Sequence, residues 1–259
     1  MVARTSRFGR LVFNRDAIVR AALRAYVEVS LAHVDPLERH SFTACAFPGW
    51  TGDLQRGAFY NANGCGDYDV VAWTEPGVVG LAYELGAGPI EQLGLSIDAV
   101  TGGPEDVRGA VPDLPSELEP AFVMAVGLLG VGPEHGQMDA GVGFWLYGGR
   151  VAGTMFDDPS ACGANRLAAW GLLRGDRLPL SCSNGVKFRA DEPSAAPIHA
   201  IIDAVTDRAL KGPTELTTDE LATLVPKPPD PERLLCAQQR LQKVGITWPG
   251  SPEIPEEPT

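Results

Sequence analysis

The sequence predicts an α+β fold, in which an antiparallel sheet built from a meander and a hairpin is flanked by helices. Two observations lead to this prediction. Runs of strand-forming residues follow one another over residues 42–84 and return over residues 141–156, whereas residues 14–33, 116–129 and 194–245 carry apolar residues at helical spacing. Because strands and helices do not alternate regularly, a doubly wound parallel sheet is not expected.

The first helix is predicted to begin at Asn14 or Asp16, which are residue types favoured at helix N-termini, and to end near His33, before Pro36. A meander of short strands should follow. The sequence Thr74-Glu75-Pro76-Gly77 predicts a type II turn between its last two strands, with proline and glycine in the positions that this turn prefers. The expected strands are residues 42–47, 58–61, 68–74 and 78–84.

The second half of the chain should supply one hairpin and several helices. Ser116 is the predicted N-cap of a helix that ends near residue 129. The pair Gly148-Gly149 is a strong signal for a two-residue hairpin turn. Further helices are expected at residues 165–173, along the apolar stripe Ile198, Ile201, Ile202 and Val205, after the cap Thr218, and from Asp230-Pro231 to Gly245.

These elements predict one large domain with two appended segments. Residues 1–226 should form a single α+β domain, and the proline-rich connection 225–231 should separate it from a helical appendage at residues 227–248. Residues 249–259 hold four prolines and three glutamates, which predicts a disordered tail.

The composition excludes several classes of function. The chain has 33 acidic against 21 basic residues and a net charge of −12, which disfavours nucleic acids and anionic membranes as partners and suits a basic protein partner. No apolar run reaches the length of a membrane span. The five cysteines are scattered without a CxxC pair, so we expect no zinc site, no metal or other cofactor, and a cytoplasmic location.

The loop between the predicted strands 58–61 and 68–74 carries most of the chemistry. Cys65 could act as a nucleophile there, with a distant histidine as base and Asp67 or Asn63 orienting it, and Glu84 nearby. The alternative is that the glycine, asparagine and aspartate residues of this loop only form a hairpin turn, and that Cys65 packs against the sheet. Asn63 and Asp67 are also candidate binding residues.

Aromatic residues suggest a second candidate surface. Alternation along the predicted strand ending at residue 147 places Trp145 and Tyr147 on one face and Phe144 on the other. Tryptophan and tyrosine favour the centres of interfaces, so Trp145 and Tyr147 are candidate residues for binding a partner. The alternative is that helices cover both faces and these rings belong to the core.

Residues 57–73, which read Gly-Ala-Phe-Tyr-Asn-Ala-Asn-Gly-Cys-Gly-Asp-Tyr-Asp-Val-Val-Ala-Trp, resemble an uncharacterised group of bacterial proteins with an NGxGD strand-loop-strand motif. Gly77, Gly80, the Glu-Pro-Ala-Phe at residues 119–122 and the strand through Trp145 extend the resemblance over about residues 57–172. The group has Asp-His-Glu where this chain has Ala82, Tyr83 and Glu84, so only the glutamate is retained. If the group were enzymes that use the Asp-His pair, the resemblance would imply an inactive member.

The general architecture is also similar to immunity and adaptor modules of the SUKH type, an analogy at the level of fold. Two functions are therefore weighed. The first is a non-catalytic, soluble protein-binding module, such as an immunity-type inhibitor or adaptor that binds a basic protein. The alternative is a cysteine-dependent hydrolase or transferase centred on Cys65, with Asp67 and Glu84.

Overall fold

The structure is a computed structural model that describes residues 2–6, 9–32, 49–62, 68–83, 107–128, 142–156, 167, 196–224 and 231–251. Contacts divide the chain into two compact units. The first comprises residues 1–22 and 45–178, and the second comprises residues 23–44 and 179–259. This division differs from the predicted boundaries at residues 226 and 248, because the helices after residue 196 cluster with the second half of the first helix.

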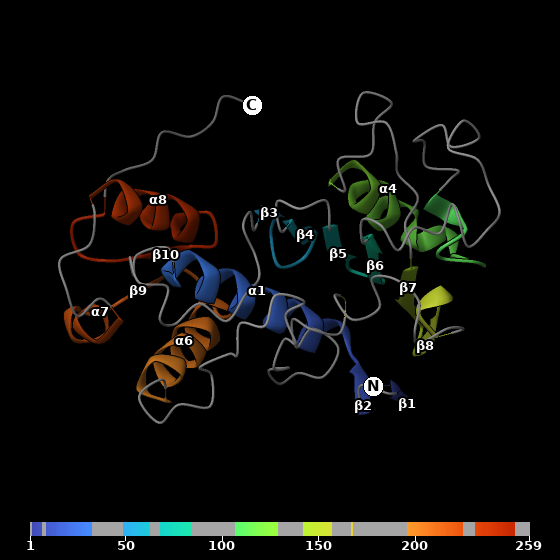
Figure 1. The fold of residues 1–259 in the computed structure, drawn as a ribbon, viewed down its shortest axis with the longest axis horizontal. Helices are drawn as coiled ribbons and strands as arrows, with labels where there is room; N and C mark the ends of the chain where they lie inside the picture. Colours follow the sequence, from blue (N-terminus) through green and yellow to red (C-terminus); the bar gives the residue numbers. More distant parts are fainter. Residues whose placement is uncertain are drawn as a thin grey trace. The chain divides into compact units, whose positions relative to one another are not determined.

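The first unit is built on a six-stranded antiparallel sheet (Figure 1). Its strands are neighbours in chain order, so the hairpin β7–β8 continues the meander of the first four strands. The predicted α+β class is therefore confirmed, while the strand expected at residues 42–47 lies outside the described residues. The strands are β3 (Gly49–Gly52), β4 (Gly57–Ala62), β5 (Tyr68–Thr74), β6 (Gly77–Tyr83), β7 (Val142–Tyr147) and β8 (Arg150–Ala152).

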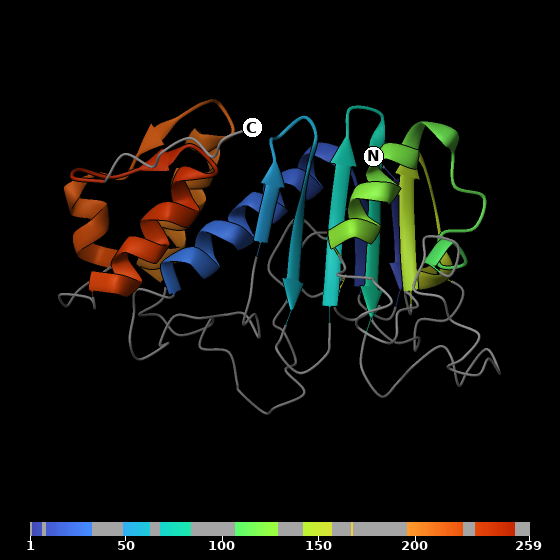
Figure 2. The same cartoon turned by 90° about the horizontal axis from the view of Figure 1, so that it is seen from above.

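One face of the sheet is covered by α4 (Glu119–Leu128), which follows the short 3₁₀ helix η2 (Ser116–Leu118) (Figure 2). Small and aromatic side chains of α4 interdigitate with alternate residues of β4, β5, β6 and β7, as strand periodicity requires. The fully buried members of this core include Leu118, Ala121, Phe122, Ala125, Ala58, Val70, Ala72, Val79 and Leu81.

The opposite face receives Phe13, whose ring makes edge-on contacts with Phe144 at 5.8 Å and with Phe156 at 5.3 Å between centroids. Phe13 ends a hairpin of β1 (Val2–Ser6) and β2 (Gly9–Phe13) that the sequence analysis missed. Residues 7–8, which join the two strands, are Arg-Phe and carry none of the residue types typical of a hairpin turn.

The predicted first helix is α1 (Arg15–Ala32), and its start confirms the capping role of Asn14. The side-chain oxygen of Asn14 accepts a hydrogen bond from the backbone N–H of Ala17 at 3.0 Å. Arg15 then donates from Nε to the carbonyl of Thr74 at 2.7 Å and from Nη2 to those of Leu54 and Gln55. This side chain ties the start of α1 to the β3–β4 and β5–β6 turns.

Two of the predicted turns have different outcomes. Gly148 and Gly149 have φ values of 54° and 76°, as the predicted two-residue hairpin turn needs. The predicted type II turn at residues 74–77 is wrong, because Gly77 pairs with Thr74 inside the ladder and has no positive φ. Gly77 is required there for close approach, since a Cβ would lie 2.0 Å from the carbonyl oxygen of Leu146.

The predicted N-cap at Ser116 is also wrong. Pro115 occupies the cap position of η2 without a side-chain hydrogen bond, and the Ser116 hydroxyl instead donates to Oε2 of Glu117 at 3.2 Å. The chain enters the helix through a 3₁₀ turn, so the predicted helix exists but begins differently.

The described residues of the second unit contain the part of α1 from Leu23 onward and three further helices, which confirms that the C-terminal segment is helical. It also contains a short parallel pair, β9 with β10, that the sequence analysis missed because each strand has only two residues. These elements are α6 (Ala196–Ala209), β9 (Thr214–Glu215), α7 (Thr218–Leu224), α8 (Pro231–Gln242) and β10 (Ile246–Thr247).

A charged network joins α1 to α6 within this unit. Arg24 Nη1 donates to Glu28 on its own helix, and Arg24 Nε donates to Asp203 on α6 at 2.5 Å. Burial by itself lowers the pKa of Arg24. The nearby carboxylates of Glu28 and Asp203 raise the pKa by more than burial lowers it, so the net shift is upward. Only 5% of Glu28 is exposed, so its charge depends strongly on this partner.

The start of α7 is fixed by a capping box at Thr217, not by the predicted cap Thr218. The Thr217 hydroxyl accepts from the N–H of Glu220 at 3.2 Å, and Oε2 of Glu220 accepts from the N–H of Thr217 at 2.9 Å. The Glu220 carboxylate also receives two hydrogen bonds from Arg208 of α6.

Replacing Glu220 with glutamine is expected to destabilise the protein by about 1 kcal/mol at pH 7, because glutamine can still accept the hydrogen bond from Thr217 but loses the ion pair with Arg208. Burial raises the pKa of Glu220, but hydrogen bonds from Arg208 and Thr217 lower it below the ordinary value of 4.5 overall. The stabilisation is therefore present above that value and is lost as pH falls through the lower folded-state pKa. Urea unfolding should show a deficit at pH 7 that shrinks in acid; a constant deficit would contradict this origin.

Candidate functional site

The predicted loop residues Asn63, Cys65 and Asp67, together with Glu84, lie outside the described residues. The strand ends that flank them are described. Ala62 pairs with Tyr68, and Tyr68 pairs with Tyr83, so the end of β4, the start of β5 and the end of β6 are neighbours at one end of the sheet.

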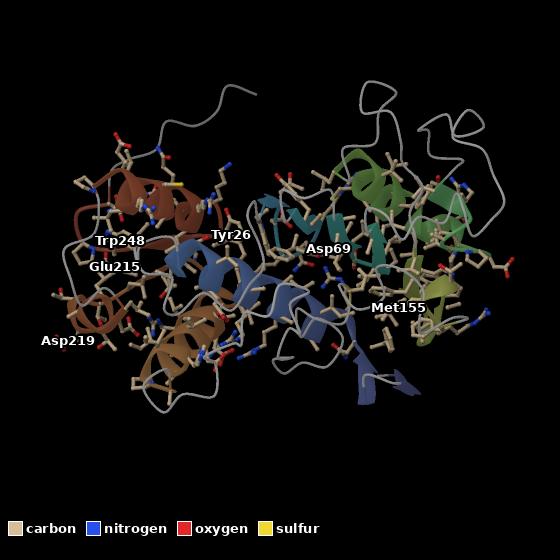
Figure 3. All side chains as sticks on the ribbon, in the orientation of Figure 1. Tyr26, Asp69, Met155, Glu215, Asp219 and Trp248 are labelled. Carbon is tan, nitrogen blue, oxygen red and sulfur yellow. The ribbon has the colours of Figure 1, made fainter. Side chains whose placement is uncertain are left out.

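Asp69 is the one acidic residue buried on the described strands of this sheet, with 1% exposure (Figure 3). It is the second residue of β5, two positions after the predicted loop. Val70 and Ala72 belong to the core beneath α4, so strand alternation places Asp69 on the opposite face of the sheet. The sequence analysis did not select Asp69, since an aspartate near a loop is most often a turn residue.

The two aromatic candidates on β7 have different environments. Trp145 is 2% exposed, and its Nε1 donates to the carbonyl of Pro112 at 2.9 Å. It is a core residue in this structure, and it does not offer a surface to a partner. Tyr147, two residues further along the same face, is only partly buried against the core.

The outer side of α4 carries the surface around Tyr147. Its inward side chains alternate with exposed positions that recur every three or four residues, as helix geometry requires. These exposed positions are Pro120, Val123 and Gly127 on α4, and Glu117 is exposed on the preceding η2. Val123 is 56% exposed and is one of two exposed large hydrophobic residues in the described part of the chain.

A direct contact joins η2, immediately before α4, to the sheet. The Tyr147 hydroxyl donates to Oε1 of Glu117 at 2.7 Å. The hydrogen bond lowers the pKa of Glu117 and raises that of Tyr147, because it stabilises the carboxylate and holds the phenolic proton. It therefore favours the ionised form of Glu117 and orients both side chains.

Further carboxylates lie at the same end of the sheet. Glu75 is exposed in the β5–β6 turn, and Asp113 is exposed next to Pro112, which accepts the hydrogen bond from Trp145. Asp113 has a φ of 54°, a left-handed conformation that aspartate tolerates better than most residues. We call Glu75, Asp113, Glu117, Val123 and Tyr147 the α4 surface.

One acidic residue of α4, Glu119, is paired with a basic residue, Arg108. Arg108 donates to both carboxylate oxygens of Glu119, at 2.5 and 3.1 Å, and its guanidinium lies 4.6 Å from the centre of the Phe122 ring. Hydrogen bonding to Arg108 lowers the pKa of Glu119. Glu119 therefore has a matched cation, and the carboxylates of the α4 surface are Glu75, Asp113 and Glu117.

Within the described ranges, no three histidine, cysteine, aspartate or glutamate side chains come close enough to hold a metal ion. No helix in that part of the chain is both long enough and apolar enough to cross a bilayer. The α4 surface combines carboxylates, one of which is hydrogen-bonded to Tyr147, with that phenol and an exposed aliphatic side chain, so it can make ion pairs, hydrogen bonds and one apolar contact with a partner.

Sequence reasoning found Tyr147 but missed the residues around it. The sequence analysis used Glu117 only as part of a helix start. Its contact with Tyr147 joins residues 30 positions apart in the chain, and it forms only because β7 pairs with β6 in the sheet. The exposure of Val123 had no separate signal, because α4 is apolar on nearly all sides.

Comparison with protein-family models gives no match, and neither the curated proteins nor the solved structures include a significant match to this chain.

Proposed function

We propose that this protein is a non-catalytic protein-binding module that binds a basic partner protein through the α4 surface. The observation that carries the proposal is the hydrogen-bonded pair of Tyr147 and Glu117, together with the exposed Val123 on the outer side of α4. An oriented tyrosine and an exposed aliphatic residue supply contact area, while the carboxylates supply charge.

The charge of the chain supports a basic partner. A net charge of −12 attracts a cationic protein over a distance, and the α4 surface adds local carboxylates where the partner would bind. Association should therefore be fast at low salt and slower as salt screens the charges. An immunity-type inhibitor of a basic toxin, or an adaptor for a basic protein, has this pattern of interaction.

The Cys65-centred enzyme remains a separate prediction. Its discriminating experiment is selective alkylation at neutral pH: a Cys65 thiol that reacts much faster than the other four would favour the enzyme, because catalytic cysteines are exposed and rich in thiolate. A Cys65 that reacts no faster than the others would remove that alternative.

The proposal is tested by affinity capture from a lysate of the cells that naturally produce the protein. The double variant Glu117→Gln/Val123→Ser should bind the captured basic protein about tenfold more weakly, which corresponds to about 1.4 kcal/mol. Titration of the purified partner against both proteins, at low and at high salt, measures the difference.

The matched control is Asp219→Asn/Leu235→Ser in the second unit. It removes one exposed carboxylate and one exposed aliphatic side chain, as the first variant does, but from the unit that does not contain the α4 surface. Binding should be unchanged in the control. Equal losses in the two variants, or no loss in either, would refute the α4 surface as the binding site.

A further inference from the structure

A basic residue borders the α4 surface at the hairpin turn between β7 and β8 (Figure 1). Arg150 is the first residue of β8, and it pairs with Tyr147 across the Gly148-Gly149 turn. Residues that pair directly across an antiparallel ladder have neighbouring side chains on the same face of the sheet. The exposed side chain of Arg150 therefore lies beside Tyr147, on the face that α4 covers.

The guanidinium of Arg150 is oriented by an aromatic ring. Its central carbon lies 5.7 Å from the centre of the Trp145 ring, which is within the range of a cation–π contact. Trp145 is itself held in place, because it is 2% exposed and its Nε1 donates to the carbonyl of Pro112. A guanidinium beside such a ring loses part of its conformational freedom and keeps its planar set of N–H donors.

The donors of Arg150 are not used within the part of the chain that the structure describes. Arg108 binds both oxygens of Glu119, whereas no carboxylate of the described residues lies within ion-pair distance of Arg150. Glu117 already accepts hydrogen bonds from Tyr147 and Ser116. An exposed guanidinium that is oriented and has its donors available matches the two oxygens of a carboxylate.

We propose, building on the proposed function, that the basic protein bound at the α4 surface carries an aspartate or glutamate within its contact site, and that Arg150 binds this carboxylate. The contact site of the partner is then mixed in charge. Its basic side chains face Glu75, Asp113 and Glu117, and its one carboxylate faces Arg150. Such a pattern selects a single orientation of the partner, because any other orientation brings like charges together.

The charge of the α4 surface alone predicts the opposite preference. A surface that acts only through its carboxylates binds the ligand with the higher positive charge more tightly. Replacing the aspartate of a basic peptide with asparagine raises the charge of the peptide, so such a surface should bind the asparagine peptide better. Recognition by Arg150 requires the aspartate peptide to bind better, so the sign of the difference separates the two mechanisms.

The probes are short peptides of lysine and leucine that carry one aspartate, placed at each position in turn. Each is matched with the same peptide carrying asparagine, and fluorescence anisotropy measures their binding to the full chain at low salt. At one position or more, the aspartate peptide should bind about fivefold more tightly than its asparagine counterpart. Arg150→Gln should reverse this preference. The control Arg233→Gln, which removes an exposed arginine from the second unit, should leave it unchanged.

Equal or tighter binding of the asparagine peptide at every position would overturn the role of Arg150, and so would a preference for aspartate that persists in Arg150→Gln. The Glu117→Gln/Val123→Ser variant separates this failure from failure of the proposed function. If only the role of Arg150 is wrong, this variant still binds both peptides of each pair more weakly than the unmodified chain does. If it binds them equally well, or if no peptide binds to the unmodified chain, the proposed function is contradicted together with the role of Arg150.

Discussion

Replacing Arg24 with methionine is expected to destabilise the second unit by about 3 kcal/mol. The substitution removes the guanidinium that bridges Glu28 of α1 and Asp203 of α6. The cost arises mainly at Glu28, because this carboxylate is 5% exposed and loses the guanidinium beside it. Asp203 is 46% exposed and can be hydrated when its partner is gone, so it adds little.

Two further variants separate these contributions. Asp203→Asn alone should cost less than about 1 kcal/mol. The double variant Arg24→Met/Glu28→Leu should recover much of the stability lost in Arg24→Met, because replacing a buried ion pair with apolar residues is often nearly neutral. Urea unfolding gives the free energies, and hydrogen exchange of the α6 amides locates the change. A double variant less stable than the single one would show that burial of the Glu28 charge is not the source of the loss.

The sequence predicted those parts of the fold that depend on interactions between residues close together in the chain. Asn14 caps α1 because its short polar side chain reaches a backbone N–H three residues away, and Gly148-Gly149 adopts positive φ because glycine has no Cβ. These interactions involve residues that are adjacent in the chain. A single sequence contains all the information that they need.

The predictions were wrong in two situations. In one, neighbouring residues can play the same local role; in the other, the packing of a distant strand or segment determines the role of a residue. Thr217 and Thr218 have the same capping chemistry, and only the reciprocal bond with Glu220 selects Thr217. Gly77 was placed in a left-handed turn position, but the approach of β7 sets its role. The burial of Trp145 depends on Pro112, which lies 33 residues earlier in a segment without regular periodicity.

The α4 surface could be anticipated only in part for the same reason. Tyr147 follows from strand alternation, but its partner Glu117 is identified only after α4 is placed on the sheet. The fold class could be predicted without knowledge of such long-range contacts, since it depends only on the number and order of strands and helices. Packing of α4 therefore decides both the core and the surface of the first unit, and its central residue should be the most sensitive to substitution.

Phe122→Ala is expected to destabilise the first unit by about 3–5 kcal/mol. Phe122 has no exposed surface, and its ring fills the space between α4 and the sheet. Truncation to alanine would leave a cavity and would also remove the ring beneath the guanidinium of Arg108. The helix itself should tolerate the change, because alanine is the best helix former.

The next residue on the helix provides the matched control. Val123 has the same backbone environment but is 56% exposed, so Val123→Ala should change the free energy of unfolding by less than about 0.5 kcal/mol. Hydrogen exchange should show faster opening of β4, β5 and β6 in the Phe122 variant and no change in the Val123 variant. Similar effects of the two substitutions would mean that α4 does not pack on the sheet through Phe122. The α4 surface, which depends on that packing to hold Glu117 against Tyr147, would then lose its structural basis as well.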